Sequence, residues 1–170
     1  MRLRKGPVRR VDAGRFSVRL SHEERDAVRT FIAQLRTLLT SEDPASDPAV
    51  AWLFPPAQPD DVIGNLEYER THGEDLLLGK LAALDTVERT LELDELSEEE
   101  MLAWLGSLNS IRLVVGTRLD VTEESTEADF AGDEQTSEMF ALYGYLTWLE
   151  GWVVDALDDD LTGTGTAPGK

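Results

Sequence analysis

Apolar residues recur with the period of an α-helix over much of the chain, and this spacing constrains the fold more than any other feature of the sequence. The strongest pattern begins at Ser97 and Glu100, whose spacing is that of a helix-capping box. The apolar residues that follow fall within an arc of roughly 120° at 100° per residue: Met101, Trp104, Leu105, Leu108, Ile111, Val115 and Leu119. The spacing predicts a helix from about residue 97 to 119.

Further segments share this period. A capping box at Ser21 and Glu24 opens a predicted helix near 22–40. Residues 61–71 have a helical pattern, and Thr71 with Glu74 forms another capping-box spacing, so we expect a break near Gly73 and a second helix as far as residue 91. A last helix near 136–157 carries one apolar stripe: Leu142, Leu146, Leu149, Val153 and Leu157.

The connecting segments have different signatures. Asp12-Ala13-Gly14 lies between two short apolar stretches, and a glycine that takes a positive φ is typical of a hairpin turn. Residues 43–61 contain five of the seven prolines and predict an ordered connector, in which residues 50–54 form one helical turn that docks Trp52 on the core. Residues 121–135 are acidic and lack periodicity, which predicts a loop.

These segments indicate a mainly α fold, a helical bundle of about four to five helices with a small N-terminal β-hairpin. The length of 170 residues fits one domain. We expect a basic arm with the first hairpin strand over residues 1–15, a single helical domain over 16–157, and a disordered tail over 158–170.

The composition excludes several classes of function. The chain has no cysteine, which rules out disulfides, thiolate metal sites and thiol redox chemistry within it. Its net charge of −18 opposes wholesale binding to nucleic acid or to an anionic membrane. No apolar stretch approaches the roughly 20 residues of a spanning helix, and the basic start lacks the apolar core of a signal peptide. A cytoplasmic protein without membrane contact is expected.

The charge is distributed unevenly along the chain. Residues 1–36 contain ten basic and four acidic side chains, whereas residues 37–118 contain five basic and seventeen acidic ones. The basic segment predicts a contact surface for phosphates or for the carboxylates of a partner. Its members are Arg2, Arg4, Lys5, Arg9, Arg10, Arg15 and Arg19. The alternative is that these side chains pair with the acidic groups of the same molecule.

The last helix offers a second candidate surface. Tyr145, Trp148 and Trp152 form an aromatic stripe roughly 60 to 120° from its leucine and valine seam. Aromatic residues at helical spacing usually pack inside a domain, which is the favoured interpretation. The alternative is that they anchor a protein partner, a second copy of the chain included.

Catalytic and metal sites find little support in the sequence. Glu69 and His72 form a single Glu-x-x-His pair, where a helical di-iron site needs two. Residues 73–80 have the wrong spacing for a phosphate-binding loop, and no nucleophilic-serine motif is present. We therefore expect no enzymatic activity, no cofactor and no bound metal.

Arg112 interrupts the apolar arc of the strongest helix, between Leu108 and Val115. A buried guanidinium needs a carboxylate, and we expect Arg112 to extend its charged end to solvent or to pair with an acid from a neighbouring helix. Ligand binding is the less favoured alternative. Asn109, one turn earlier, is expected to help satisfy a helix end.

Several segments, taken together, resemble the AosR-like actinobacterial family, long catalogued as a domain of unknown function. They are Leu53-Phe54-Pro55-Pro56, Pro59-Asp60-Asp61, Gly79 to Leu84, Trp104-Leu105, Leu108-Asn109, Arg112-Leu113-Val114, Gly116 to Leu119 and Val121-Thr122-Glu123. The resemblance implies a regulator that adjusts transcription under oxidative stress by contacting a sigma factor and its RNA polymerase. The switch implied for the family is a Cys-x-x-x-Cys disulfide, which this chain lacks.

Within the matching segments, five residues are interpreted as structural, because they mark a helix that ends near residue 118: Asn109, Arg112, Gly116, Thr117 and Arg118. The leading functional hypothesis is a noncatalytic regulator that contacts a protein partner through its basic arm and aromatic stripe. Direct DNA binding by the N-terminal arginines is the alternative. A metal held by carboxylates near His72 is a third.

Overall fold

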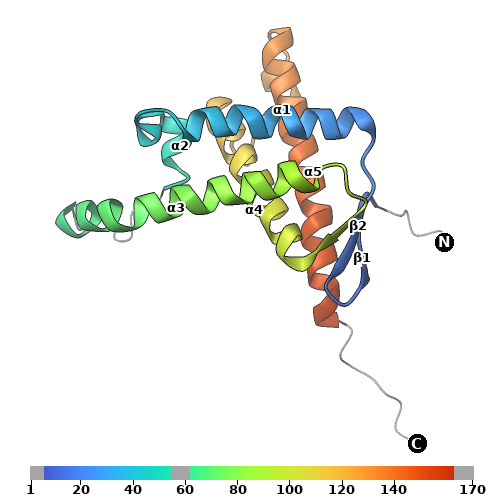
Figure 1. Cartoon of the computed structure of the whole chain (residues 1–170). Coiled ribbons are helices and arrows are strands. Elements are labelled where there is room, and N and C mark those ends of the chain that lie inside the picture. Colours follow the sequence, from blue (N-terminus) through green and yellow to red (C-terminus); the bar gives the residue numbers. More distant parts are fainter. Residues whose placement is uncertain (1–5, 55–61, 163–170) are drawn as a thin grey trace, which may run out of the picture.

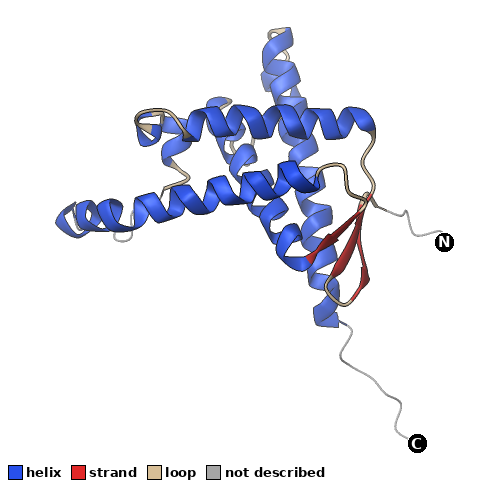
Figure 2. Cartoon of the chain, in the orientation of Figure 1, coloured by secondary structure: helices blue, strands red, loops and turns tan. Residues whose placement is uncertain are grey.

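A computed structural model describes the backbone of residues 6–54 and 62–162, and the side chains of residues 6–54 and 72–159. This part of the chain forms five α-helices and a small sheet (Figures 1 and 2). The helices are α1 (His22–Leu39), α2 (Pro48–Ala51), α3 (Val62–Thr90), α4 (Glu98–Arg118) and α5 (Glu134–Thr162). The strands are β1 (Val8–Asp12), β2 (Arg15–Val18) and β3 (Glu95–Ser97). The predicted helical bundle with an N-terminal hairpin is confirmed.

The sheet is antiparallel with β2 in the centre, between β1 and β3. The turn between β1 and β2 contains Gly14 at a φ of 68°, the left-handed conformation expected there. One face is buried against the helices and carries four apolar side chains, Val8, Phe16, Val18 and Leu96. β3 was not predicted because a strand of three residues is too short to show an alternating pattern.

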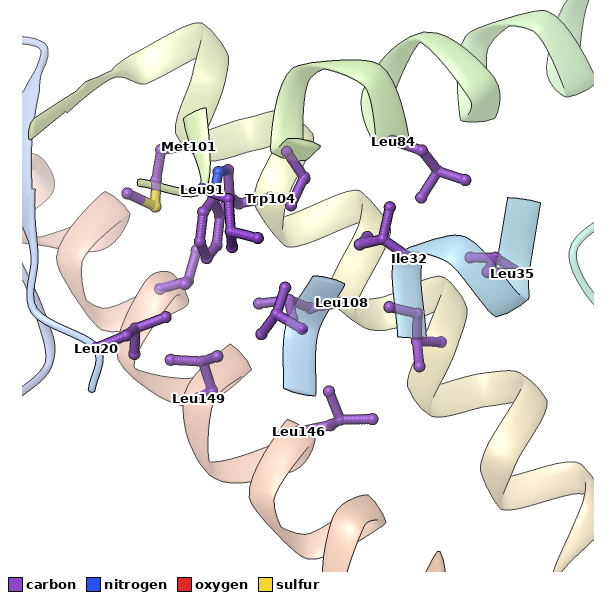
Figure 3. Close-up of a cluster of buried hydrophobic side chains, with 14 of the residues drawn as sticks. Leu20, Ile32, Leu35, Leu84, Leu91, Met101, Trp104, Leu108, Leu146 and Leu149 are labelled. Carbon is purple, nitrogen blue, oxygen red and sulfur yellow. The ribbon is translucent and has the colours of Figure 1, made fainter. Parts of the chain in front are cut away.

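Helix α4 lies at the centre of the fold, packed against α3 on one side and α5 on another (Figure 1). Trp104 is fully buried, and its indole nitrogen donates a hydrogen bond of 2.8 Å to the hydroxyl of Thr90 on α3. Met101 and Leu108 line the same core, where Leu146 and Leu149 of α5 meet them (Figure 3). Burial extends to Ser107 and Ser110, outside the predicted arc, because α4 is covered from more than one direction.

Two helix starts follow the sequence closely. Ser21 and Glu24 form a reciprocal capping box at the start of α1, and Ser97 and Glu100 do so at the start of α4. In each box the serine hydroxyl accepts a bond from the N3 backbone N–H, and the glutamate accepts one from the backbone of the serine. Both predicted capping boxes are confirmed.

The predicted break near Gly73 is wrong, since α3 is continuous from Val62 to Thr90. A glycine inside a helix costs only about 1 kcal/mol relative to alanine. Leu84, Val87 and Leu91 bury their side chains in the core and offset that cost. Burial of the helix therefore outweighs the local break signal.

The last helix is longer than its apolar stripe indicated. α5 begins at Glu134 and ends at Thr162, so the first five residues of the expected tail are helical. The remaining tail, 163–170, lies outside the described residues. In the segment predicted as a loop, residues 127–130 form one 3-10 turn that buries Phe130.

Trp52 does not dock on the core as the sequence led us to expect. Asp47 caps α2 by accepting a bond from the backbone N–H of Ala49, and this fixes the phase of the short helix. Val50 and Leu53 consequently point inward, while Trp52 is 70% exposed. In the described part of the chain, no helix has the length and apolar character to cross a bilayer.

Candidate functional site: a groove beside Trp52

Two arginines of the basic segment, Arg10 and Arg15, are engaged by the molecule itself. Arg10 lies over the ring of Phe16, 4.7 Å from its centroid, and donates to the backbone carbonyls of Ala156 and Leu157 on α5. Arg15 forms an ion pair with Glu95 on the neighbouring strand β3. These contacts support the alternative in which the basic residues pair internally, at least for these two side chains.

Two arginines of the sheet region face solvent instead. Arg19 is exposed and Arg9 is half-buried, and neither forms an ion pair or side-chain hydrogen bond within the described residues. Register places Arg9 opposite Ser17, on the face of the sheet away from Phe16. Arg2, Arg4 and Lys5 lie outside the described residues. The described positive surface is therefore narrower than the sequence indicated.

The aromatic stripe of α5 is divided between the fold and the surface. Trp152 is half-buried and packs closely on Gly6. A Cβ atom at Gly6 would lie only 2.3 Å from the indole ring. Tyr145 is also half-buried, and burial, with the negative charge of Glu24 nearby, raises the pKa of its hydroxyl. Trp148 contacts the Tyr145 ring at 5.8 Å between centroids but remains 47% exposed. Only Trp148 presents a large aromatic surface here.

Arg112 pairs with an acid from a neighbouring helix, as predicted. Its Nε atom lies 2.7 Å from Oε2 of Glu150 on α5, and both side chains are largely buried. Its Nη2 atom donates to Oδ1 of Asn109, at 3.1 Å, one turn earlier on α4. Asn109 thus positions the guanidinium rather than satisfying a helix end. The contacts with Glu150 and Asn109 use only part of the five N–H donors of the Arg112 guanidinium.

The C-terminal end of α4 packs tightly on α5. A Cβ at Gly116 would lie 2.9 Å from the ring of Tyr143, so a larger residue would displace that ring. Thr117 donates its hydroxyl to the carbonyl of Leu113, and Arg118 pairs with Asp47 at the start of α2, at 3.0 Å. These residues do serve a structural role at the helix end, as interpreted from the sequence.

Helix α4 ends in a Schellman motif, with aspartate at the position where glycine is usual. The backbone N–H of Val121 donates to the carbonyl of Gly116, and that of Asp120 donates to the carbonyl of Thr117. Asp120 occupies the left-handed position with a φ of 53°, where glycine is the usual choice. Backbone conformations of this kind are often retained at functional sites.

A groove of about 280 Å³ lies between α2, α4 and α5, and we call it the Trp52 groove. Leu113, Val121 and Tyr143 supply apolar walls, and Arg112, Thr117 and Asp120 supply polar groups. Trp52, which sequence reasoning assigned to the core, stands at the rim. A mixed groove beside a protruding tryptophan can bind a protein segment, because tryptophan anchors are common at interfaces. The one sequence feature that could have indicated an exposed Trp52 was its place in a proline-rich connector.

The metal-binding candidates of the sequence lie apart from the Trp52 groove. Among the residues whose side chains are described, no three histidine, cysteine or acidic side chains gather closely enough to hold a metal ion. His22 lies 3.3 Å from Asp26 at the exposed start of α1, and His72 is exposed on α3. The side chain of Glu69 is outside the described residues, so the Glu69–His72 pair cannot be placed.

A larger groove of about 410 Å³ separates α1, α4 and the first turns of α5. Phe31, Leu38, Ile111 and Leu142 give it a mainly apolar lining, with Arg118 and other polar side chains also on its wall. Arg118 is the residue that forms the ion pair with Asp47 at the start of α2.

Comparison with known proteins assigns the chain to a family. A model of a domain of unknown function, DUF2017, matches residues 5–157. The chain belongs to this family. No curated protein matches it, and no solved structure does. All residues of the Trp52 groove lie within the span that characterises DUF2017.

Proposed function

We propose that this DUF2017 protein is a noncatalytic, cytoplasmic regulator of transcription that binds a protein partner in the Trp52 groove. The observation that carries the proposal is the 70% exposure of Trp52 beside a groove with both apolar and charged walls. Leaving an indole in water forfeits much of the free energy that its burial would contribute. A partner that covers Trp52 recovers this contribution.

The resemblance to the AosR-like family supplies the class of partner. Leu113, Gly116, Thr117 and Val121 belong to the segments that carry this resemblance, and all four line the groove. We therefore propose a sigma factor, alone or within RNA polymerase, as the partner, and oxidative stress as the condition. Because the chain contains no cysteine, it lacks the thiol switch implied for that family, and we propose that another molecule senses the oxidant.

The test is capture of purified RNA polymerase, with and without alternative sigma factors, by the immobilised full-length protein. Trp52→Ala should weaken capture by about thirtyfold or more if the indole is an anchor. Trp148→Ala is the matched control, since it removes a tryptophan that is also substantially exposed but lies on α5, away from the groove lining. Equal capture by the wild type and Trp52→Ala would refute the groove as the contact.

Arg9 of β1 and Arg19, just after β2, contribute the charged part of the contact in this proposal. Substitution of Arg9 and Arg19 together by glutamate should slow association and reduce its salt dependence, because rim charges act mainly on the rate of encounter. Surface plasmon resonance at two salt concentrations measures both effects. Arg10 and Arg15 are unsuitable for this test because their side chains stabilise the sheet.

An unchanged association rate in the Arg9 and Arg19 double variant would exclude these two side chains from the interface. Direct DNA binding receives less support, because Arg10 and Arg15 are engaged within the molecule and the whole chain carries a charge of −18. A mobility shift of duplex DNA at low salt, lost steeply as salt increases, would favour DNA binding over the protein partner.

A further inference from the structure

A third pocket, of about 280 Å³, lies where α3 crosses α4, and it shares no lining residue with the Trp52 groove. Leu35 of α1 and Leu84 of α3 form part of its apolar wall, and both appear in Figure 3. Gly79 and Gly106 border it without obstruction, since a Cβ at either would meet no atom within 4 Å. We call it the Lys80 pocket, after the single basic residue in its lining.

Ser107 lies in the wall of this pocket and carries an unused hydrogen-bonding group. Its side chain is 2% exposed, and its hydroxyl has no hydrogen-bond partner within the described residues. A helical serine can donate to the carbonyl four residues earlier, but Ser107 does not. A buried hydroxyl in this state lacks the compensation for its lost hydration that a bound acceptor would provide.

Lys80 supplies a positive charge to the same pocket. It is half-buried, and no carboxylate in the described part of the chain forms an ion pair with it. Its partial burial lowers the pKa of the ammonium group, and no neighbouring acid counteracts this effect. A lysine withdrawn from water on a protein with 34 acidic residues would ordinarily find one of them as a partner.

We propose that the Lys80 pocket binds a small organic monocarboxylate, whose carboxylate accepts hydrogen bonds from the Lys80 ammonium and the Ser107 hydroxyl. The Lys80 ammonium can only donate and the Ser107 hydroxyl is able to donate, so together they suit an acceptor. The positive charge of Lys80 favours an anion and repels a protonated amine. The apolar lining from Leu76, Ala83 and Leu84 suits a short hydrocarbon body. Asp75 also borders the pocket and opposes a second negative charge, which disfavours phosphate.

The volume restricts the size of the ligand. Pockets for small molecules usually span roughly 300 to 1,000 Å³, so the volume of this pocket is just below that range. A chain of about four to eight carbons is the expected range on that scale. The proposal does not rest on the proposed function, since binding here needs no residue of the Trp52 groove.

The test is isothermal titration calorimetry of the full-length protein with straight-chain carboxylates from acetate to decanoate. We expect one site, with the tightest binding between butanoate and octanoate. Lys80→Met keeps the length of the side chain without its charge and should weaken binding at least about tenfold. Ser107→Ala should weaken it severalfold, and Asp75→Asn should tighten it.

Gly106→Leu provides an independent check, because it places a bulky side chain at the pocket wall without altering either polar donor. It should abolish binding while circular dichroism and the thermal midpoint show a folded protein. Hexylamine and inorganic phosphate are the control probes, and neither should compete. Absence of binding across the carboxylate series, preference for either control probe, or equal binding by folded Lys80→Met and wild type would each overturn the proposal.

Discussion

Asp120 shows how a single backbone conformation shapes the groove. It is the only non-glycine with a positive φ in the described part of the chain, and it turns the chain so that Val121 lines the groove beside Gly116. Sequence patterns do not reveal this position, because aspartate is equally common in ordinary turns. The helix end near Arg118 was predictable, whereas the direction in which the chain leaves it was not.

Asp120→Gly should increase the stability of the protein slightly. Relief of left-handed strain contributes roughly 1 to 2 kcal/mol for a typical residue and less for aspartate. The greater freedom of glycine in the unfolded chain offsets about 0.4 to 1 kcal/mol. The expected net gain is about 0.5 kcal/mol, measured by urea denaturation.

Gly14→Ala is the matched control for this prediction, since Gly14 has a similar φ of 68° and open space around it. That substitution adds strain and should lower the free energy of unfolding by about 1 kcal/mol. A loss of stability in Asp120→Gly would show that the aspartate side chain contributes more than its backbone conformation costs.

Among the helices, α4 shows which features are local and which are not. Its start is specified by Ser97 and Glu100, which lie three residues apart. The hydrogen bonds between them need no other part of the chain. Its burial on several sides depends on α3 and α5, which pack on it from distant parts of the sequence. The start was therefore predictable, and the extent of its buried surface was not.

The capping box of α4 should make stability depend on pH. The backbone N–H of Ser97, together with Arg89, holds the pKa of Glu100 below its ordinary value of 4.5. A lowered pKa in the folded state means that this contribution is complete above pH 4.5 and is lost as the pH falls through the folded-state pKa. Glu100→Gln keeps a hydrogen-bond acceptor at this position but removes the charge that faces Arg89 and the helix N-terminus, so it should destabilise the protein by about 0.5 to 1 kcal/mol at pH 7.

The difference between the wild type and Glu100→Gln should shrink as the pH is lowered below 4.5, as measured by urea denaturation at each pH. Glu99→Gln is the control, because Glu99 precedes Glu100 in the same first turn but takes no part in the capping box. A difference that stays constant down to acid pH would contradict the role assigned to the Glu100 carboxylate.

Over the whole molecule, the sequence indicated a basic front and an acidic body, and the structure joins the two. Arg25 is buried, and it donates to the backbone of Leu91 and to the side chain of Asp94. Arg36 pairs with Asp85 on α3, at 2.7 Å. Much of the positive surface seen in the sequence is therefore used to hold α1 against α3 and the segment that follows it.

The excess negative charge should make the protein more stable at higher salt. With a net charge of −18, self-repulsion opposes the folded state, and salt screens it. Salt also weakens exposed ion pairs such as Arg15–Glu95, but each of these contributes only about 0 to 1 kcal/mol. Screening of repulsion should therefore dominate.

The expected result is a rise in the thermal midpoint of about 2 to 4 °C between roughly 0.02 and 0.5 M NaCl, measured by circular dichroism. Sodium sulfate is unsuitable as the salt because it also strengthens the burial of apolar surface. A midpoint that falls with NaCl would mean that the ion pairs outweigh the repulsion.

The sequence by itself determined the helical class, the hairpin turn at Gly14 and the capped starts of α1 and α4, because these features depend on neighbours within a few residues. It also determined that Arg112 needs a carboxylate, because a guanidinium that loses its hydration requires an opposite charge. The tertiary structure alone decided that Trp52 faces solvent, that Lys80 and Ser107 meet in one pocket, and that Arg10 is occupied by α5. Each of those outcomes depends on how helices and strands from distant parts of the chain cross. The crossing is set by the packing of the whole core, which no local pattern encodes.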